Sequence, residues 1–231
     1  MPTTHQREQL EKNLREYRKK WLGKSRGKSL NEADTRICVN DLLTNVLGYA
    51  MQEEIKTEYA IRGQYADYVI QLKRKKQFVV EVKAMEIDLT AKHLLQASHY
   101  AADEGIDWIL LTNGMSLELH RVIFSKPVSD VQIFKFDLSD LSQIEKASDA
   151  LVNLTKRAVE KGELEEYWKR FDALSSAKLI KTIYTEEIIG ALRRKIKKDS
   201  GMTFDQTDVL SAIHELITCA NRDVVKPKKL K

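Results

Sequence analysis

The stretch YADYVIQLKRKKQFVVEVKAMEIDLTAKHLLQASHY, residues 65–100, organises the rest of this chain. Two strand-like runs, YADYVIQL and QFVVEVKA, flank a basic turn, and a helix-like segment follows them. Side chains alternate between the two faces of a strand, so Glu81 and Lys83 point to one face while Phe78, Val80 and Val82 point to the other. The stretch therefore predicts a hairpin followed by a helix, with charged groups on one face of the hairpin.

Further polar residues in this stretch can join the same place. Asp67 lies on the first strand-like run, and Gln96 and Tyr100 lie four residues apart on the helix-like segment. Residues four apart share one face of a helix. One hairpin and one helix can thus gather an aspartate, a glutamate, a lysine, a glutamine and a tyrosine.

The register of the hairpin decides whether Asp67 meets Glu81. In an antiparallel pair the residue numbers of partners have a constant sum, and Asp67 shares a face with Glu81 only when that sum is even. A two-residue turn at Arg74-Lys75 gives an odd sum, whereas a three-residue loop over 74–76, or a bulge, gives an even one. The three-residue loop would set Asp67 opposite Lys83. An active site here therefore requires a loop or a bulge that the sequence does not impose.

Two converging carboxylates would call for a hard divalent cation with oxygen ligands, Mg²⁺ or Mn²⁺. The backbone carbonyl of Val82 is well placed as a further ligand beside Asp67 and Glu81. Lys83 would then neutralise a phosphate oxygen, or orient and deprotonate an attacking water. Such a group of residues is suited to phosphodiester hydrolysis. Alternating charges on a solvated strand face remain the other interpretation, because Glu-x-Lys by itself occurs on many exposed strands.

Bulk composition limits the class of protein. The chain has 231 residues, 42% hydrophobic and 32% charged, which suits one sizeable core with a small second subdomain. Its net charge of +5 permits a nucleic-acid partner without requiring one. Cys38 and Cys219 form no metal or disulfide motif, and neither a signal peptide nor a membrane span is recognised. We expect a soluble, unsecreted, cytoplasmic protein.

The remaining pattern predicts a mixed α/β sheet flanked by helices, with a helical C-terminal region. Ile37 with four later residues, and Leu94 with Leu95, Ala97 and Ala101, are expected to form the buried stripes of two helices. A strand, a crossover helix and a second, apolar strand in succession imply a mixed sheet. Expected helices cover 5–22, 31–47, 88–104, 141–160, 163–172, 185–198 and 205–221, and expected strands 53–61, 65–72, 77–84, 106–114, 116–124 and 131–138. Three regions follow: an N-terminal helix with a basic connector (1–29), a core (30–140) and a helical C-terminal region (141–231).

Three other features have open interpretations. The turn Thr112-Asn113-Gly114 is either a functional loop or a plain hairpin turn. His93 either lines the cleft or is a surface histidine. The basic cluster Arg193, Arg194, Lys195, Lys197 and Lys198 is either a solvated helix face or a surface that follows a DNA backbone.

Motifs from Glu32 to Phe124 together resemble the PD-(D/E)xK nuclease superfamily, and more narrowly the N-terminal nuclease domain of type I restriction enzyme R subunits. The matching residues occur in the order of that family over roughly 90 residues, so the whole set is far more specific than any one of its motifs. They are Glu32, Asp34-Thr35-Arg36, Leu42-Leu43, Leu47-Gly48-Tyr49, Ala66-Asp67-Tyr68, Glu81-Val82-Lys83, Gln96 with Tyr100, and Leu111-Thr112-Asn113-Gly114.

This resemblance implies a restriction-endonuclease-like core and a Mg²⁺-dependent (or Mn²⁺-dependent) DNA endonuclease of restriction, defence or mobile-element DNA processing. It implies that Asp67, Glu81 and Lys83 are the metal-binding and catalytic residues. It also implies that Glu32 approaches the site from the first helix of the core, and that Gln96 and Tyr100 contact DNA or order the site.

Two departures from the family pattern matter. Ala66 stands where a proline usually precedes the aspartate, which does not affect the chemistry. No Gly-x-x-x-x-Gly-Lys-Ser/Thr motif occurs, so we expect no nucleotide cofactor, and activity that is ATP-independent or depends on a partner. DNA is the expected partner, with a homodimer or a specificity-supplying protein as further possibilities. The alternatives are a non-cleaving nucleic-acid-binding or assembly module with the nuclease fold, and an RNA nuclease.

Overall fold

The computed structural model of the chain describes residues 2–23, 30–61, 64–125 and 128–218, with side chains omitted for 58–61, 64 and 65. The chain divides into two compact units, Met1–Trp168 and Lys169–Lys231. Cys219 and the C-terminal basic tail lie outside the described residues. Among those described, no helix is long and apolar enough to cross a membrane.

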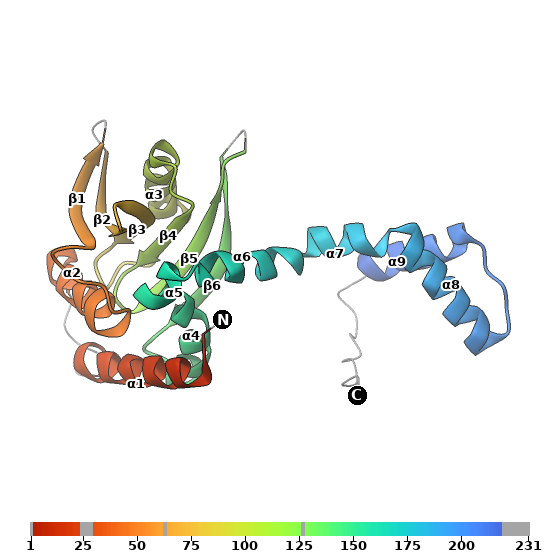
Figure 1. The fold of residues 1–231 in the computed structure, drawn as a ribbon, viewed down its shortest axis with the longest axis horizontal. Coiled ribbons are helices and arrows are strands. Elements are labelled where there is room, and N and C mark those ends of the chain that lie inside the picture. Colours follow the sequence, from red (N-terminus) through yellow and green to blue (C-terminus); the bar gives the residue numbers. More distant parts are fainter. Residues whose placement is uncertain (1, 24–29, 62–63, 126–127, 219–231) are drawn as a thin grey trace. The chain divides into compact units, whose positions relative to one another are not determined.

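The described part of the first unit forms one mixed sheet of six strands in the order β1-β2-β3-β4-β5-β6 (Figure 1). Antiparallel pairing joins all neighbours except β3 and β4, which are parallel and are connected through α3 (Ala91–Glu104). The predicted mixed sheet is therefore confirmed. Its strands are β1 (Ile55–Ile61), β2 (Gln64–Leu72), β3 (Lys75–Val82), β4 (Trp108–Thr112), β5 (Ser116–Ile123) and β6 (Ser129–Asp137).

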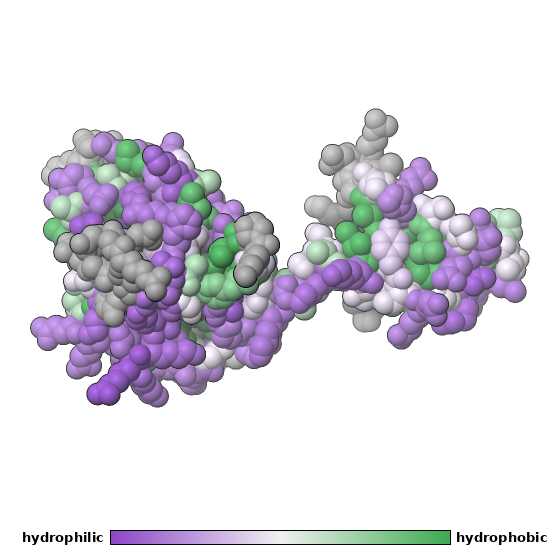
Figure 2. Space-filling view, turned by 90° about the horizontal axis from the view of Figure 1, so that it is seen from above, coloured by the Kyte–Doolittle hydropathy of each residue, from purple (hydrophilic) through white to green (hydrophobic). Residues whose placement is uncertain are grey.

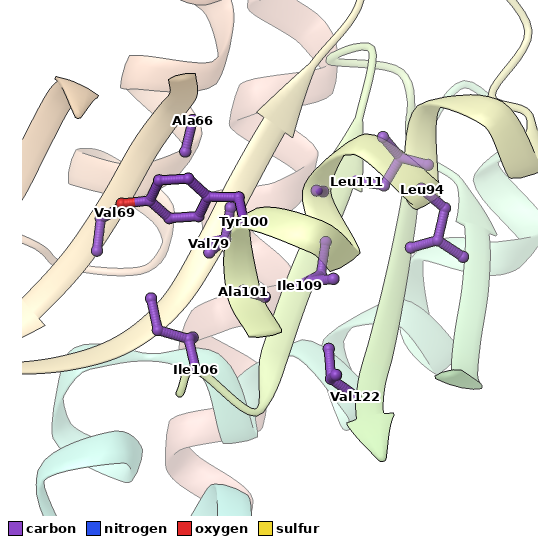
Figure 3. Close-up of a cluster of buried hydrophobic side chains, with 11 residues drawn as sticks. Ala66, Val69, Val79, Leu94, Tyr100, Ala101, Ile106, Ile109, Leu111 and Val122 are labelled. Carbon is purple, nitrogen blue, oxygen red and sulfur yellow. The ribbon is translucent and has the colours of Figure 1, made fainter. Parts of the chain in front are cut away.

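One face of the sheet is covered by α3. Below this helix lies a buried cluster that includes Val69, Val79, Ile109 and Leu111 from successive strands, with Tyr100 from α3 itself (Figure 3). The alternate residues of β3 are also fully buried, on the opposite face, as the predicted alternation requires. Burial on both faces explains why β4 is almost wholly apolar, and why the buried part of β3 is apolar except for Glu81.

Hydrogen bonds attach helices α1 (Thr4–Trp21) and α2 (Glu32–Asp41) to the sheet and its turns. The Tyr17 hydroxyl of α1 donates to the Gly114 carbonyl at 2.6 Å, and the Tyr68 hydroxyl of β2 donates to the Arg36 carbonyl of α2 at 3.2 Å. A π-helical turn, η1 (Leu42–Val46), continues α2. The predicted helix 31–47 is thus present with a change of hydrogen-bond pattern.

The first unit ends in short helical segments that pack on α1 and the sheet. Trp108 of β4 meets Trp168 of α6 edge-on at 6.4 Å between ring centroids, and the Arg121 guanidinium lies over both rings. This aromatic contact gives Trp168 a packing role. The segments are η2 (Leu141–Gln143), α4 (Ile144–Leu151), η3 (Val152–Leu154), α5 (Lys156–Glu160) and the first part of α6 (Glu163–Ala173).

The second unit is helical and buries little apolar surface. It contains α7 (Ser176–Ile183), α8 (Glu186–Ser200) and α9 (Gln206–Thr218), and within its described residues only Ile189 and Val209 are buried hydrophobics. Figure 2 shows hydrophobic side chains gathered at the surface of this unit. The exposed large hydrophobics are Leu174, Leu179, Tyr184, Leu192, Met202 and Leu216.

Three sequence-based expectations are wrong. Ile37 is 57% exposed, and the neighbouring Cys38 takes its buried place on α2. Leu95 is 55% exposed, because Leu94, Ala97 and Ala101 already fill the face of α3 toward the sheet. No helix was expected over α7, which is short and has no buried residue. The main sequence signal for this helix is its N-cap, Ser175, whose hydroxyl accepts a hydrogen bond from the Lys178 N–H.

Candidate active site

A bulge in β3 sets the register of the β2–β3 hairpin. The turn has two residues, Lys73 and Arg74. Next to it Leu72 pairs with Lys75, and the residue numbers of this pair have an odd sum. The register then shifts between Ile70 and Gln71, so that Tyr68 pairs with Val80, an even sum. The three-residue loop is therefore wrong, and the bulge gives the register that the active-site hypothesis requires.

Asp67 directly precedes Tyr68 in the sequence. Tyr68 and Val80 form the β2–β3 pair farthest from the turn, so Asp67 lies at the open end of the hairpin. Its Oδ2 accepts a hydrogen bond from the backbone N–H of Val82 at 2.7 Å. The Asp67 carboxylate, which is 9% exposed, thus lies against the β3 backbone between Glu81 and Lys83. The fold brings together the three residues that the sequence motif had linked.

Glu81 is a buried carboxylate, 2% exposed, in the middle of the sheet. Lys83 Nζ donates to Glu81 Oε1 at 2.6 Å, so the two side chains meet on one face of β3. Burial raises the pKa of Glu81 to about 6, with further increases from the charges of Asp67 and Glu32, while the Lys83 ammonium acts in the opposite direction. Three carboxylates therefore lie close enough to influence one another.

Glu32 enters the site from the first turn of α2, and Arg36 lies one turn later on the same face. Arg36 Nη2 donates to Glu32 Oε1 at 3.0 Å and also donates to Asp67 Oδ1. Sequence reasoning quoted Arg36 as a family motif but missed this role. Its spacing of four from Glu32 on a helix was the available signal.

The segment after Lys83 is held from two sides. The backbone N–H of Lys83 donates to the Thr112 carbonyl at 2.9 Å, and the Met85 N–H donates to the Thr35 hydroxyl of α2 at 3.1 Å. The buried Asn113 carboxamide uses all its hydrogen-bonding positions in the β4–β5 turn: it donates to the carbonyls of Met85 and Ile87 and accepts from the N–H groups of Met115 and Ser116. The Thr112-Asn113-Gly114 turn therefore fixes the backbone that follows the candidate catalytic lysine.

The two α3 residues of the candidate set differ in environment. Tyr100 is 2% exposed and packs with Ala66, the neighbour of Asp67, in the cluster of Figure 3. Gln96 is exposed. A buried Tyr100 suits the ordering role among the two that the resemblance implied. Burial and the charge of Lys83 lower the pKa of His93.

Asp67, Glu81 and the Val82 carbonyl offer the hard oxygen donors that Mg²⁺ or Mn²⁺ prefers. Three carboxylates, those of Glu32, Asp67 and Glu81, meet two cationic groups, so the cluster carries one net negative charge. A divalent cation therefore fits the chemistry of the site. Within the described residues, however, no three His, Cys, Asp or Glu side chains are grouped so that they could hold a metal ion.

Residues 31–132 match the family described as type I restriction enzyme R protein N terminus (HSDR_N), which confirms the resemblance and supports a restriction-related role. No curated protein matches the chain. A solved structure, "cryoEM structure DrdV-DNA complex", aligns with 62% of this chain and 96% of its own, at 18% identity and a TM-score of 0.40.

Proposed function

We propose that this chain is a metal-dependent DNA endonuclease that hydrolyses phosphodiester bonds in restriction, defence or mobile-element DNA processing. The observation that carries the proposal is the meeting of Asp67, Glu81 and Lys83 at one place, with Asp67 on the Val82 N–H and Lys83 on Glu81. The family match over residues 31–132 supports it. Mg²⁺ or Mn²⁺ is the proposed cofactor, held by Asp67, Glu81 and the Val82 carbonyl.

Phosphodiester hydrolysis needs charge compensation and an oriented water. A bound divalent cation supplies Lewis-acid stabilisation of the phosphate and lowers the pKa of its water. Lys83, 17% exposed, can reach a non-bridging phosphate oxygen or the attacking water from its position beside Glu81. The water oxygen forms the new bond to phosphorus and gives up a proton, the ester bond to the leaving oxygen breaks, and the leaving oxygen takes up a proton.

Substrate cleavage by the purified full chain tests the proposal. The substrates are supercoiled, linear and single-stranded DNA and RNA, each with Mg²⁺, with Mn²⁺ and with EDTA. We expect DNA cleavage that EDTA abolishes, and that Lys83→Ala or Glu81→Ala lowers by about 100-fold or more. Lys75→Ala, a change to an exposed lysine at the other end of β3, is the matched control and should leave cleavage unchanged. Cleavage that persists in EDTA and in Lys83→Ala would contradict the assigned site.

A non-cleaving nucleic-acid-binding or assembly module with the same fold is the second candidate. The observation in its favour is that no metal-holding group of three side chains occurs in the part of the chain that the structure describes. This candidate predicts salt-sensitive DNA binding that Asp67→Ala leaves unchanged, with no cleavage under either metal. Preferential cleavage of RNA in the same screen would identify an RNA nuclease instead. A homodimer or a partner that supplies specificity remains a proposal that belongs to either candidate.

A further inference from the structure

Arg36 holds two of the three carboxylates of the candidate site. One nitrogen of its guanidinium, Nη2, donates to both Glu32 and Asp67. The third carboxylate, Glu81, has Lys83 as its partner instead. Asp67 therefore depends on Arg36 for its only side-chain counter-ion among the hydrogen bonds and ion pairs of the described residues.

The Arg36 side chain is only partly used in this position. It is 34% exposed, and its Nε is buried without a hydrogen bond among the described residues. The backbone of α2 is anchored separately, by the Tyr68 hydroxyl on the Arg36 carbonyl and by the Thr35 hydroxyl on the Met85 N–H. The guanidinium can therefore leave Asp67 while α2 stays in place.

Arg36 and a divalent cation compensate the same negative charge. Two cationic groups on one carboxylate repel each other, so Arg36 on Asp67 disfavours a metal there. A guanidinium also matches a phosphate well, because its planar donors bind two phosphate oxygens at once.

We propose that Arg36 is an exchangeable counter-ion that releases Asp67 to the metal when a DNA phosphate takes over its guanidinium. This inference rests on the proposed nuclease function and adds a regulation of the same site. Metal binding and DNA binding are then positively coupled, and the coupling is reciprocal. Without DNA, Arg36 keeps the site in a state of low metal affinity, so metal-loaded enzyme forms mainly on the substrate.

Mn²⁺ titration followed by electron paramagnetic resonance of the unbound ion tests this coupling. One series titrates three proteins without DNA: wild type, Arg36→Gln and Arg36→Lys. A second series uses a Lys83→Ala background, with Arg36 intact or with the same two changes, and titrates each protein with and without a short duplex. We expect Arg36→Gln to bind Mn²⁺ about tenfold more tightly than wild type without DNA, and the duplex to tighten Mn²⁺ binding only when Arg36 is present. Arg36→Lys keeps the charge but loses the fork, so it should bind Mn²⁺ as wild type does and respond less to the duplex.

Arg7→Gln is the matched control. Arg7 also pairs with a single aspartate, Asp149, at 3.6 Å, and its Nε is likewise buried without a hydrogen bond, but it lies on α1. Its removal should leave Mn²⁺ affinity unchanged. Equal or weaker Mn²⁺ binding by folded Arg36→Gln would overturn the inference, and if that variant does not fold, a duplex that leaves Mn²⁺ binding to the Arg36-containing protein unchanged overturns it. Absence of Mn²⁺ binding in every protein, with and without duplex, would instead reject the metal-dependent function itself.

Discussion

Glu81 is a buried carboxylate of the candidate site, and its charge lowers the stability of the fold. Its carboxylate is almost fully buried in the sheet, and burying a charge is unfavourable for the free energy of folding. Lys83 compensates it only in part, since the pKa of Glu81 still rises to about 6 from an ordinary value of 4.5. A site that binds a cation must keep such a poorly compensated carboxylate, although the metal-free fold loses stability by it.

We predict that the metal-free fold becomes less stable as Glu81 ionises. The folded chain holds the Glu81 proton more tightly than the unfolded chain does, so proton binding to Glu81 stabilises the fold. This stabilisation is complete below pH 4.5 and is lost as pH rises through about 6. A shift of about 1.5 units corresponds to about 2 kcal/mol. Glu81→Gln lacks this titration. Its free energy of unfolding, relative to wild type, should rise by about 2 kcal/mol between about pH 4 and about pH 7.5.

Urea denaturation in EDTA at the two pH values measures this difference. Glu16→Gln, at an exposed position of α1, is the control and should follow the wild-type pH dependence. If Glu81→Gln also follows the wild-type pH dependence, the carboxylate is not held against its charge in the folded chain.

At the scale of elements, the β2–β3 hairpin decides whether a site exists. A shift of one residue in register moves every side chain of a strand to the other face. The bulge makes this shift between the two-residue turn and the site, so β3 presents Glu81 and Lys83 beside Asp67. Lys73 and Arg74 form the turn with φ of +48° and +66°, which are left-handed conformations that residues other than Gly, Asn and Asp rarely adopt.

We predict that Lys73→Asn with Arg74→Gly stabilises the first unit by about 1 kcal/mol, because Asn-Gly suits this two-residue turn. Thermal unfolding measures the gain, and cleavage activity should stay as in the wild type, since the turn lies at the far end of the strands from Asp67. The control is Lys75→Gly at the first residue of β3, where glycine should lower stability. A loss of stability in the Asn-Gly variant would mean that Lys73 and Arg74 make interactions worth more than the backbone cost.

At the scale of the whole molecule, the two units have different physical characters. The first has a sheet with a large buried core, whereas the described part of the second has two buried hydrophobics and a basic helix, α8. Within that helix Arg193 donates to the Phe204 carbonyl, and Lys195 pairs with Asp199. Arg194, Lys197 and Lys198 are exposed and are the residues of this cluster best placed to meet phosphates.

We predict that replacing Arg194, Lys197 and Lys198 together by alanine weakens DNA binding and makes it less sensitive to salt. Each phosphate contact contributes about 0.9 to the slope of log affinity against log salt, so the slope should fall by about 2–3. Fluorescence anisotropy of a labelled duplex over a salt series measures it, and Lys12→Ala on α1 should leave the slope unchanged. An unchanged slope in the triple variant would identify this cluster as a solvated helix face.

The sequence by itself determined what depends on short-range rules. Period-two and helical patterns predicted nearly every element, including the faces of β3, because alternation and helical spacing are local properties. The order of the motifs also identified the family resemblance, and strand alternation placed Glu81 and Lys83 on one face. Ile37 and Leu95 were expected to be buried and are exposed. A helix with several apolar residues does not reveal which of them its neighbours will cover.

Only the tertiary structure decided the contacts that join distant segments. The bulge in β3, the Arg36 guanidinium on Asp67, the burial of Tyr100 and the Asn113 bonds to the segment after Lys83 all depend on which elements pack together. Strand register is a matter of a single residue, and burial depends on the partner surface, so neither is encoded in a local pattern. The sequence thus supplied the chemical groups of the candidate site, and long-range packing set their positions and their counter-ions.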